Sequence, residues 1–331
     1  MRFTPHLHTL SGLLCVIFLT ISGLVNAGTQ KSHPPMSWTT LGTAGGPVLI
    51  PSRSQPANLL SINDEHWLID CGDGCGEQLA ATGLQPENVN TLFITHLHMD
   101  HIGGLQGLIG LRWMTHARQP LTIYGPPGTR ALVAGLVDAL QPTQRIGLGL
   151  AAGKSNHPVA KSVNVVELKD GSRLDFHGVH VSAQRNSHFD NPPGHPVDNG
   201  SSSLSYRFDH AGYSVGVTGD TGPDKRLPGF FGGVDLLVSE VIDLPAIAAI
   251  INSPQTKLPT AVKKAMIQHL REHHLSPEQA GELAQEAGVS ELVFTHLVIA
   301  GPTPQIAPKL IEQARTAFDG EIRVAHDLER F

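Results

Sequence analysis

A cluster of four ligand-type side chains limits what this chain can fold into more than any other feature. His96, His98, Asp100 and His101 lie within six consecutive residues. Residues 91–94, just before them, have the pattern of a short buried strand, so the cluster is expected on the tight loop at the carboxyl end of that strand. Imidazole nitrogens and carboxylate oxygens are the usual protein ligands of zinc. The cluster therefore predicts a metal site rather than a polar surface loop, even in a chain with 19 histidines.

The spacing of the cluster favours two metal ions over one. Residues i and i+2 of an extended loop face the same way, so His96 and His98 are expected to bind one ion. Asp100 and His101 are then left for a second ion. A catalytic zinc also keeps one coordination position open for water.

Three further ligands are expected at the ends of other strands. His188, Asp220 and His296 each follow a predicted strand. One carboxylate that bridges two ions, and one more histidine for each ion, would complete the coordination begun at residues 96–101. Alone, each of the three would be an ordinary loop residue. Together they predict a binuclear centre.

Predicted strands and helices alternate along the chain in a way that favours an α/β fold. Strands are predicted at 58–62, 66–69, 91–94, 121–124, 179–183, 204–208, 213–217 and 291–294, and helices at 104–115 and 128–140. Two helices are expected in the C-terminal third, at 260–272 and 276–288. The second begins with Ser276 as the cap and Gln279 three residues later, and Gly288 ends it. Strand-rich halves flanked by helices predict an αβ/βα four-layer sandwich.

Composition excludes some classes of protein. With 40% hydrophobic and 16% charged residues the chain has the composition of a globular protein, and residues 28–331 are expected to form one domain. The formal charge is −6, and no run of basic residues is longer than Lys263 and Lys264. A protein that neutralises a phosphate backbone needs a basic surface, so nucleic acid is disfavoured as a partner.

Residues 1–27 have the pattern of a secretory signal peptide. Arg2 precedes an apolar run at 10–25, and Ala27 ends a small-residue cleavage pattern. The alternative, a membrane anchor, is weaker because the run is short for a full span and is interrupted by polar residues and glycines. The mature protein is therefore expected to be periplasmic or secreted, without a stable membrane anchor. Its two remaining cysteines, Cys71 and Cys75, could form a disulfide there or stay as buried thiols.

These motifs together resemble the metallo-β-lactamase superfamily and, within it, the ribonuclease Z-like branch. The resemblance spans roughly residues 40–300. Besides the cluster and His188, the matching segments are LGT at 41–43, LIDCG at 68–72, VTGD at 217–220, HLSPEQA at 274–280 and FTH at 294–296. The resemblance implies the four-layer αβ/βα fold and a pair of zinc ions.

The resemblance also implies how the ligands are shared between the two ions. The first zinc ion would be bound by His96, His98 and His188, the second by Asp100, His101 and His296, and Asp220 would bridge them. True β-lactamases of the superfamily have a cysteine where Asp220 stands, so that activity is not expected here.

Two residues are expected to move protons. In this branch a histidine just before the penultimate helix protonates the leaving group, and His274 matches it, although the adjacent His273 could take the role. Asp100 could act as the base for the attacking water while it also contacts a metal ion. A hydroxide made on the zinc pair at neutral pH would attack an electrophilic phosphorus or sulfur atom, and the departing oxygen then needs a proton or a metal.

The leading hypothesis from the sequence is a periplasmic binuclear zinc hydrolase of sulfuric or phosphoric esters, an arylsulfatase or phosphodiesterase, with a small anionic ester as substrate. Export and acidity favour it. The segment at 141–158 also favours it, because this segment is short, whereas a ribonuclease Z that works on tRNA would use a basic protruding arm. One alternative is a ribonuclease Z-like endonuclease that processes the 3′ end of tRNA. Another is a metal-binding protein without turnover, and a homodimer is left open.

We expect export to remove residues 1–27 and to leave Gly28 as the new N-terminus, because an apolar run followed by small residues at 25 and 27 is what signal peptidase recognises. Cleavage would remove one Arg and no acid, which leaves 22 basic against 29 acidic residues and a formal charge of −7. Intact-mass measurement of the protein from a periplasmic fraction checks this. A cytosolic species that still starts at Met1 would contradict it and would favour the tRNA hypothesis.

Overall fold

The computed structural model describes residues 35–146, 157–190 and 200–331. Residues Pro34–Phe331 form one compact unit. The expected signal peptide at 1–27 lies outside the described residues, as do parts of the segments at 141–158 and 190–203. Within the described ranges, no helix is both long enough and apolar enough to cross a bilayer.

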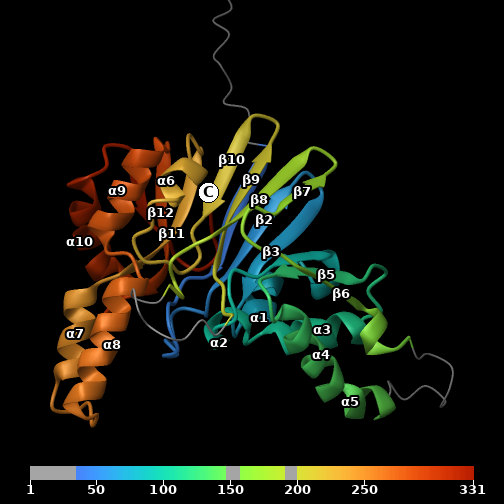
Figure 1. The fold of residues 1–331 in the computed structure, drawn as a ribbon. Coiled ribbons are helices and arrows are strands. Elements are labelled where there is room, and N and C mark those ends of the chain that lie inside the picture. The colour runs from blue at the N-terminus through green and yellow to red at the C-terminus, as the bar shows by residue number, and fades with distance from the viewer. Residues whose placement is uncertain (1–34, 147–156, 191–199) are drawn as a thin grey trace, which may run out of the picture. The chain divides into compact units, whose positions relative to one another are not determined.

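Two sheets of seven strands each form the centre of this unit (Figure 1). The first has the order β14-β1-β2-β3-β4-β5-β6, with β1 (Met36–Gly42), β2 (Ala57–Ile62), β3 (Glu65–Cys71), β4 (Thr91–Phe93), β5 (Leu121–Gly125), β6 (Val163–Glu167) and β14 (Glu329–Arg330). The second has the order β13-β12-β11-β10-β9-β8-β7, with β7 (Arg173–Phe176), β8 (Val179–Arg185), β9 (Leu204–His210), β10 (Tyr213–Val217), β11 (Leu236–Ile242), β12 (Glu291–Val298) and β13 (Glu321–Val324).

Both sheets combine antiparallel hairpins with parallel strands. β1, β2 and β3 pair antiparallel, whereas β3 to β6 run parallel. The second sheet repeats the plan, because β7 to β10 are antiparallel and β10 to β13 are parallel. The carboxyl ends of β4, β10 and β12 are therefore available to carry loops with functional side chains.

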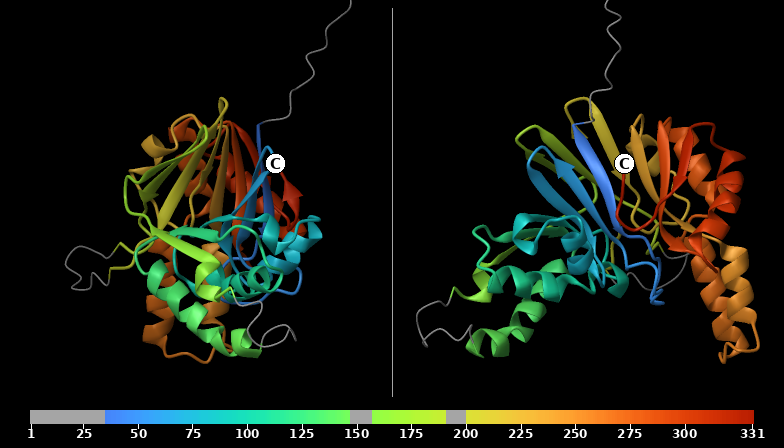
Figure 2. Two further views of the ribbon diagram at one scale, coloured as in Figure 1. Left: turned by 90° about the vertical axis from the view of Figure 1, so that its right-hand side faces the viewer. Right: turned by 180° about the vertical axis from the view of Figure 1, so that it is seen from behind.

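Helices cover the outer face of each sheet, as the turned views in Figure 2 show. The first sheet packs against α1 (Cys75–Ala81), α3 (Leu105–Met114) and α4 (Thr129–Ala139), and the second against α6 (Leu227–Phe230), α9 (Pro277–Ala287) and α10 (Thr303–Arg315). Three apolar layers result, one between the sheets and one under each set of helices. The predicted αβ/βα four-layer sandwich is confirmed.

The pattern of the central strands follows from burial on both faces. Leu236 and Val238 of β11 point between the sheets, whereas Leu237 and Val241 point under the helices. A strand covered on both sides reads as a continuous apolar run, because neither face meets water. β4 follows the same rule, because Leu92 and Phe93 at its end are both apolar and lie in different layers.

Aromatic side chains fill the layer between the sheets. The ring of Phe93 lies 4.9 Å from that of Tyr124 and 5.4 Å from those of Tyr206 and Phe208. Tyr206 also donates a hydrogen bond of 2.7 Å to the carbonyl of Ile94. The aromatic layer thus ties the second sheet to the end of β4, two residues before His96.

Most expected elements are found, and some are missed. The helix after Ser276 has the predicted capping box, and Gly288 ends it with a φ of 64°. Among the described residues, however, the C-terminal third contains five helices and not two, because α6, α7 (Leu244–Asn252) and α10 accompany α8 (Thr260–His273) and α9. Two shorter helices, α2 (Met99–Ile102) and α5 (Gln141–Ile146), complete the described set. Cys71 and Cys75 are buried free thiols, so the disulfide alternative does not hold.

Candidate metal centre

All seven expected ligands converge at the carboxyl ends of the central strands. The first sheet supplies His96 and His98 from the loop after β4, and Asp100 and His101 from α2, whereas the second sheet supplies His188 after β8, Asp220 after β10 and His296 from β12. The centre therefore lies between the two sheets. Its geometry depends on how firmly the layer between them is packed.

The local structure differs from the sequence prediction at two of these places. Residues Met99–Ile102 form one turn of helix instead of a continuous loop, and the backbone nitrogen of His101 donates to the carbonyl of His98. This turn directs Asp100 and His101 away from His98 and toward a second cluster. His296 does not follow its strand but lies inside it, because β12 continues to Val298.

A bulge explains how a strand residue can face the site. Thr295 pairs with Glu240 and Leu297 pairs with Val241, so His296 has no partner in β11. Its φ of 44° is in the left-handed region. A bulge inserts one extra residue and re-aims its side chain, which is how His296 reaches the other ligands.

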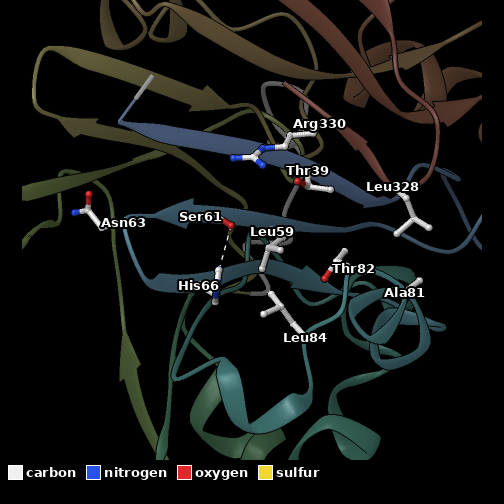
Figure 3. A pocket seen from close by; sticks show the side chains of 10 residues that line it. All are labelled: Thr39, Leu59, Ser61, Asn63, His66, Ala81, Thr82, Leu84, Leu328 and Arg330. Carbon is white, nitrogen blue, oxygen red and sulfur yellow. Dashed lines mark hydrogen bonds between the residues drawn. The ribbon is translucent and has the colours of Figure 1, made fainter. Parts of the chain in front are cut away.

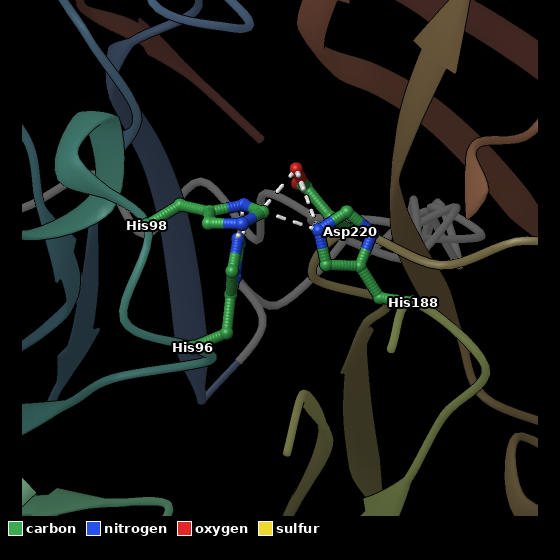
Figure 4. A group of neighbouring side chains, drawn as sticks. All are labelled: His96, His98, His188 and Asp220. Atoms are coloured by element: carbon green, nitrogen blue, oxygen red, sulfur yellow. Dashed lines mark hydrogen bonds and ion pairs between the residues drawn. The ribbon is translucent and has the colours of Figure 1, made fainter. Parts of the chain in front are cut away.

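His96, His98, His188 and Asp220 form the first cluster (Figure 4). His98 Nδ1 lies 3.0 Å from His96 Nε2 and 3.2 Å from His188 Nε2. Asp220 Oδ2 lies 3.8 Å from His96 Nε2 and 4.0 Å from His188 Nε2. A tetrahedral zinc site places neighbouring ligand atoms roughly 3.3 Å apart, so these distances fit one ion.

Asp100, His101 and His296 form the second cluster, next to the other oxygen of Asp220. His296 Nε2 lies 3.4 Å from Asp100 Oδ2 and 3.2 Å from Asp220 Oδ1. His101 Nε2 lies 3.7 Å from Asp100 Oδ2 and 3.3 Å from Asp220 Oδ1. Asp220 therefore offers one oxygen to each cluster, which is the arrangement of a bridging carboxylate.

The chemistry of these atoms fits bound cations. His101 Nε2, Asp220 Oδ1 and His296 Nε2 are buried and have no hydrogen-bond partner among the described residues. Leaving a buried polar atom without a hydrogen bond costs about 1–3 kcal/mol. Three such atoms that point to the same place would be stabilised by a cation that binds all of them. The two buried His/Asp clusters are consistent with a dinuclear metal site.

Neighbouring residues orient the imidazoles so that their other nitrogens face the clusters. Asp70 Oδ2 accepts a hydrogen bond of 2.8 Å from His101 Nδ1, and the carbonyl of His273 accepts one of 2.9 Å from His188 Nδ1. Asp70 also accepts from the backbone and hydroxyl of Thr95. Such outer partners fix the tautomer and the ring orientation of a metal-binding histidine.

Burial keeps the histidines of the first cluster in their metal-binding form. It lowers the pKa of His188 to about 3 and holds the pKa of His96 well below its usual range. Both imidazoles are therefore neutral at pH 7. Since only a neutral imidazole can donate its lone pair to a metal ion, neither has to lose a proton first.

The two candidates for the general acid lie differently. His274 Nδ1 is 2.7 Å from the carboxylate of Glu240, and its side chain belongs to a group with Asp220 and His296. Burial lowers the pKa of His274, but the Glu240 carboxylate and the hydrogen bond to it raise it more, to about 9. His273 instead directs its Nδ1 to the carbonyl of Ser187. Of the two, His274 is the one that lies with Asp220 and His296 while its Nδ1 is hydrogen-bonded to Glu240.

Sequence reasoning gave no role to Asp70 and missed Glu240. Glu240 is 2% exposed in the middle of the apolar strand β11. A lone acid inside an apolar run is the signal that could have identified it, because a buried carboxylate needs a partner. Asp70 lies inside the mostly apolar strand β3 in the same way and has a φ of 60°. Unusual backbone of this kind often accompanies functional sites.

A cavity of about 560 Å³ opens beside the first cluster. Its walls are Leu97, His98, Pro127, Gly128, Phe189, Gly200, Ser201 and Ser202. The ring of Phe189 lies 5.1 Å from that of His98. A second hollow of about 410 Å³ on the first sheet, where Ser61 and His66 are hydrogen-bonded, contains none of the expected site residues (Figure 3). Of these two hollows, the cavity at His98 is the one that adjoins the centre.

Comparison with known proteins agrees with this geometry. The family described as "Beta-lactamase superfamily domain" matches residues 66–297. A protein named Ribonuclease Z from Mycobacterium avium (strain 104) is 35% identical over 300 residues, which cover 88% of this chain and 96% of that protein. This chain belongs to the metallo-β-lactamase superfamily and to its ribonuclease Z-like branch. The Ribonuclease Z of Mycolicibacterium paratuberculosis is similar at 34% identity and the same coverage.

Solved structures show the same superfamily fold. The metallo-β-lactamase fold protein YhfI from Bacillus subtilis matches with a TM-score of 0.62 at 21% identity, over 90% of this chain and 99% of that one. The short form of human tRNase Z matches with a TM-score of 0.58 at 22% identity, over 89% of this chain and 98% of that one. At these identities, the likeness supports the sandwich architecture of a metallo-β-lactamase superfamily member and no finer conclusion.

We expect the protein loaded with zinc to hold about two metal equivalents and Asp220→Ala to hold one or fewer, because that variant removes the oxygens that both clusters share. Metal analysis after gel filtration checks this. His180→Ala is a matched control, since His180 is an exposed histidine paired only with Asp175. Full metal content in Asp220→Ala would contradict the bridging geometry.

Proposed function

We propose that this chain is a zinc-dependent hydrolase of phosphodiesters. The observation that carries the proposal is the division of the two Asp220 oxygens between two His/Asp clusters, next to a histidine paired with a buried carboxylate. The sequence analysis left aryl sulfates and phosphodiesters as alternative substrates. The similarity to proteins named Ribonuclease Z favours phosphodiesters. Export of the mature protein remains part of the proposal.

The chain's own residues supply both proton transfers. When bound, a pair of zinc ions lowers the pKa of water and offsets the charge of the ester oxygens. Asp100 accepts the proton of the attacking water, and its Oδ2 is held in place by the backbone nitrogen of Gly46 at 3.1 Å. As the bond between phosphorus and the leaving oxygen breaks, His274 donates the proton of its Nε2 to that oxygen, while Glu240 holds its Nδ1.

The cavity beside His98 suits one substituent of such a diester. Phe189 is a half-buried aromatic ring in its wall, and aromatic rings stack on nucleobases as well as on aryl groups. The relatives' names make the 3′ end of a precursor tRNA the first substrate to test. Small diesters are the second candidate, because a formal charge of −6 disfavours a long polyanion.

We expect the zinc-loaded protein to hydrolyse bis-p-nitrophenyl phosphate and to hydrolyse p-nitrophenyl sulfate at least about tenfold more slowly. A chelator and His96→Ala should abolish both activities, whereas His180→Ala should not. Cleavage of precursor tRNA at its 3′ end, measured on denaturing gels, would assign the relatives' substrate to this chain. No hydrolysis of any of the three by metal-loaded protein would support a metal-binding protein without turnover.

We expect His274→Ala to lower turnover by roughly 10² to 10⁴-fold for diesters with poor leaving groups, the usual range for a lost general acid. Good leaving groups such as p-nitrophenolate should suffer much less, because they depart without a proton. Steady-state kinetics over a leaving-group series, with metal content measured beside it, checks this. Equal losses across the series would exclude the acid role, and a larger effect of His273→Ala would move the role to that residue.

A further inference from the structure

The helical pair α7 and α8 projects from the sandwich next to the metal centre. Figures 1 and 2 show the pair extending beyond the sheets on one side of α2, while α4 and α5 do so on the other. None of the fourteen residues of α8 is buried. Yet α8 ends at His273, whose carbonyl holds His188. One end of α8 is therefore fixed at the centre, and the rest of it lies in the open.

One face of α8 runs outward from the centre. His273, His269, Met266 and Val262 are spaced by four, three and four residues, so they fall within about 60° of one another around the helix. The rings of His269 and His188 are 6.3 Å apart, which places this face against the first cluster. From His273 to Val262 it extends about 16 Å.

This face is apolar and exposed beyond its two histidines. Val262 is 42% exposed and Met266 is 40% exposed. Lys264 and Arg271 lie on the opposite side of the helix, about 160–180° from His273. Lys263 turns toward α7, where its Nζ donates to the carbonyl of Ser253 at 3.1 Å. None of the three Lys and Arg residues of α8 therefore extends from this face toward a phosphate backbone laid along it.

Exposed apolar side chains also occur close to Asp100. Val48 and Leu49 are 69% and 70% exposed, in the loop whose Gly46 nitrogen donates to Asp100. Met99 is 72% exposed and lies between the ligand candidates His98 and Asp100. An exposed apolar patch beside a functional site is a place where an apolar group can bind. The surroundings of the centre thus favour an ester with an apolar part.

We propose that the substrate is a phosphodiester with one extended alkyl substituent, and that this alkyl chain lies along the Val262–Met266 face of α8 while the phosphate reaches the metal centre. The inference rests on the proposed phosphodiesterase function and names its substrate class. The reaction is unchanged, since water adds to phosphorus and the leaving oxygen departs with a proton. A second copy of the chain, or a bilayer, is the other possible cover for this face.

The test uses p-nitrophenyl alkyl phosphates from methyl to decyl, below their micelle concentrations, with the zinc-loaded protein. We expect kcat/KM to rise by up to about fourfold for each methylene added once the chain is long enough to pass His269 and reach Met266, as burial of CH₂ groups predicts. In the double variant Val262→Gln with Met266→Gln, the decyl-to-methyl ratio should fall close to one. Lys264→Gln, on the opposite face, should keep both the ratio and the methyl ester activity.

A binding measurement makes the result independent of turnover. Monoalkyl methylphosphonates carry the single charge of a diester, and calorimetry should show a Kd that falls with chain length in the wild-type protein but not in the double variant. Hydrolysis with a flat chain-length profile would overturn this inference and leave the proposed function standing. If no ester is hydrolysed but binding still depends on chain length, the proposed function is wrong and the alkyl-binding face of α8 stands. The inference would also be overturned if chain length had no effect and the double variant instead dissociated a dimer of the wild-type protein. Loss of vesicle binding in the double variant, again with no effect of chain length, would have the same consequence.

Discussion

The rest of the structure depends on one carboxylate placed between two groups of histidines. Asp220 comes from the second sheet, yet His96 and His101, which lie 3.8 Å and 3.3 Å from its oxygens, come from the first. Neither sheet alone holds enough ligands for a two-metal centre. The sheets must therefore keep their separation and register, and the aromatic layer around Phe93 together with the bond from Tyr206 to the carbonyl of Ile94 holds them at the place where the ligands leave.

Three of the five imidazoles in the two clusters are further constrained by contacts on the side away from Asp220. His101 is held by Asp70, His188 by the carbonyl of His273, and His96 Nδ1 lies 3.1 Å from the hydroxyl of Thr95. These contacts fix which nitrogen faces the centre. His98 differs, because its side chain is exposed and forms a wall of the adjoining cavity. The centre is thus rigid on its buried side and open at His98, which is where a substrate can enter.

The sequence identified the seven side chains that converge here, because most of them follow a strand whose apolar pattern is readable and because metal chemistry restricts their residue types. It did not predict the backbone conformations that direct these side chains toward one another. The bulge at His296 depends on the pairing of β12 with β11, and the turn at Met99–Ile102 depends on contacts that pattern alone does not contain. Glu240 was missed because its meaning comes from a partner 34 residues away, His274, and not from its neighbours.

The segment from Glu240 to His274 links the proposed proton donor to the helical pair α7 and α8. Its two ends form the carboxylate–histidine pair, and the backbone nitrogen of Ile242 bonds to the carbonyl of Leu275, so both ends are fixed together at the sheet. Most of the residues between them form the helical pair α7 and α8. A group bound along α8 would act on a helix that continues directly into His273 and His274. Because fold and ligands do not set the substrate, such a projecting element can change specificity while the strand ends keep the centre intact.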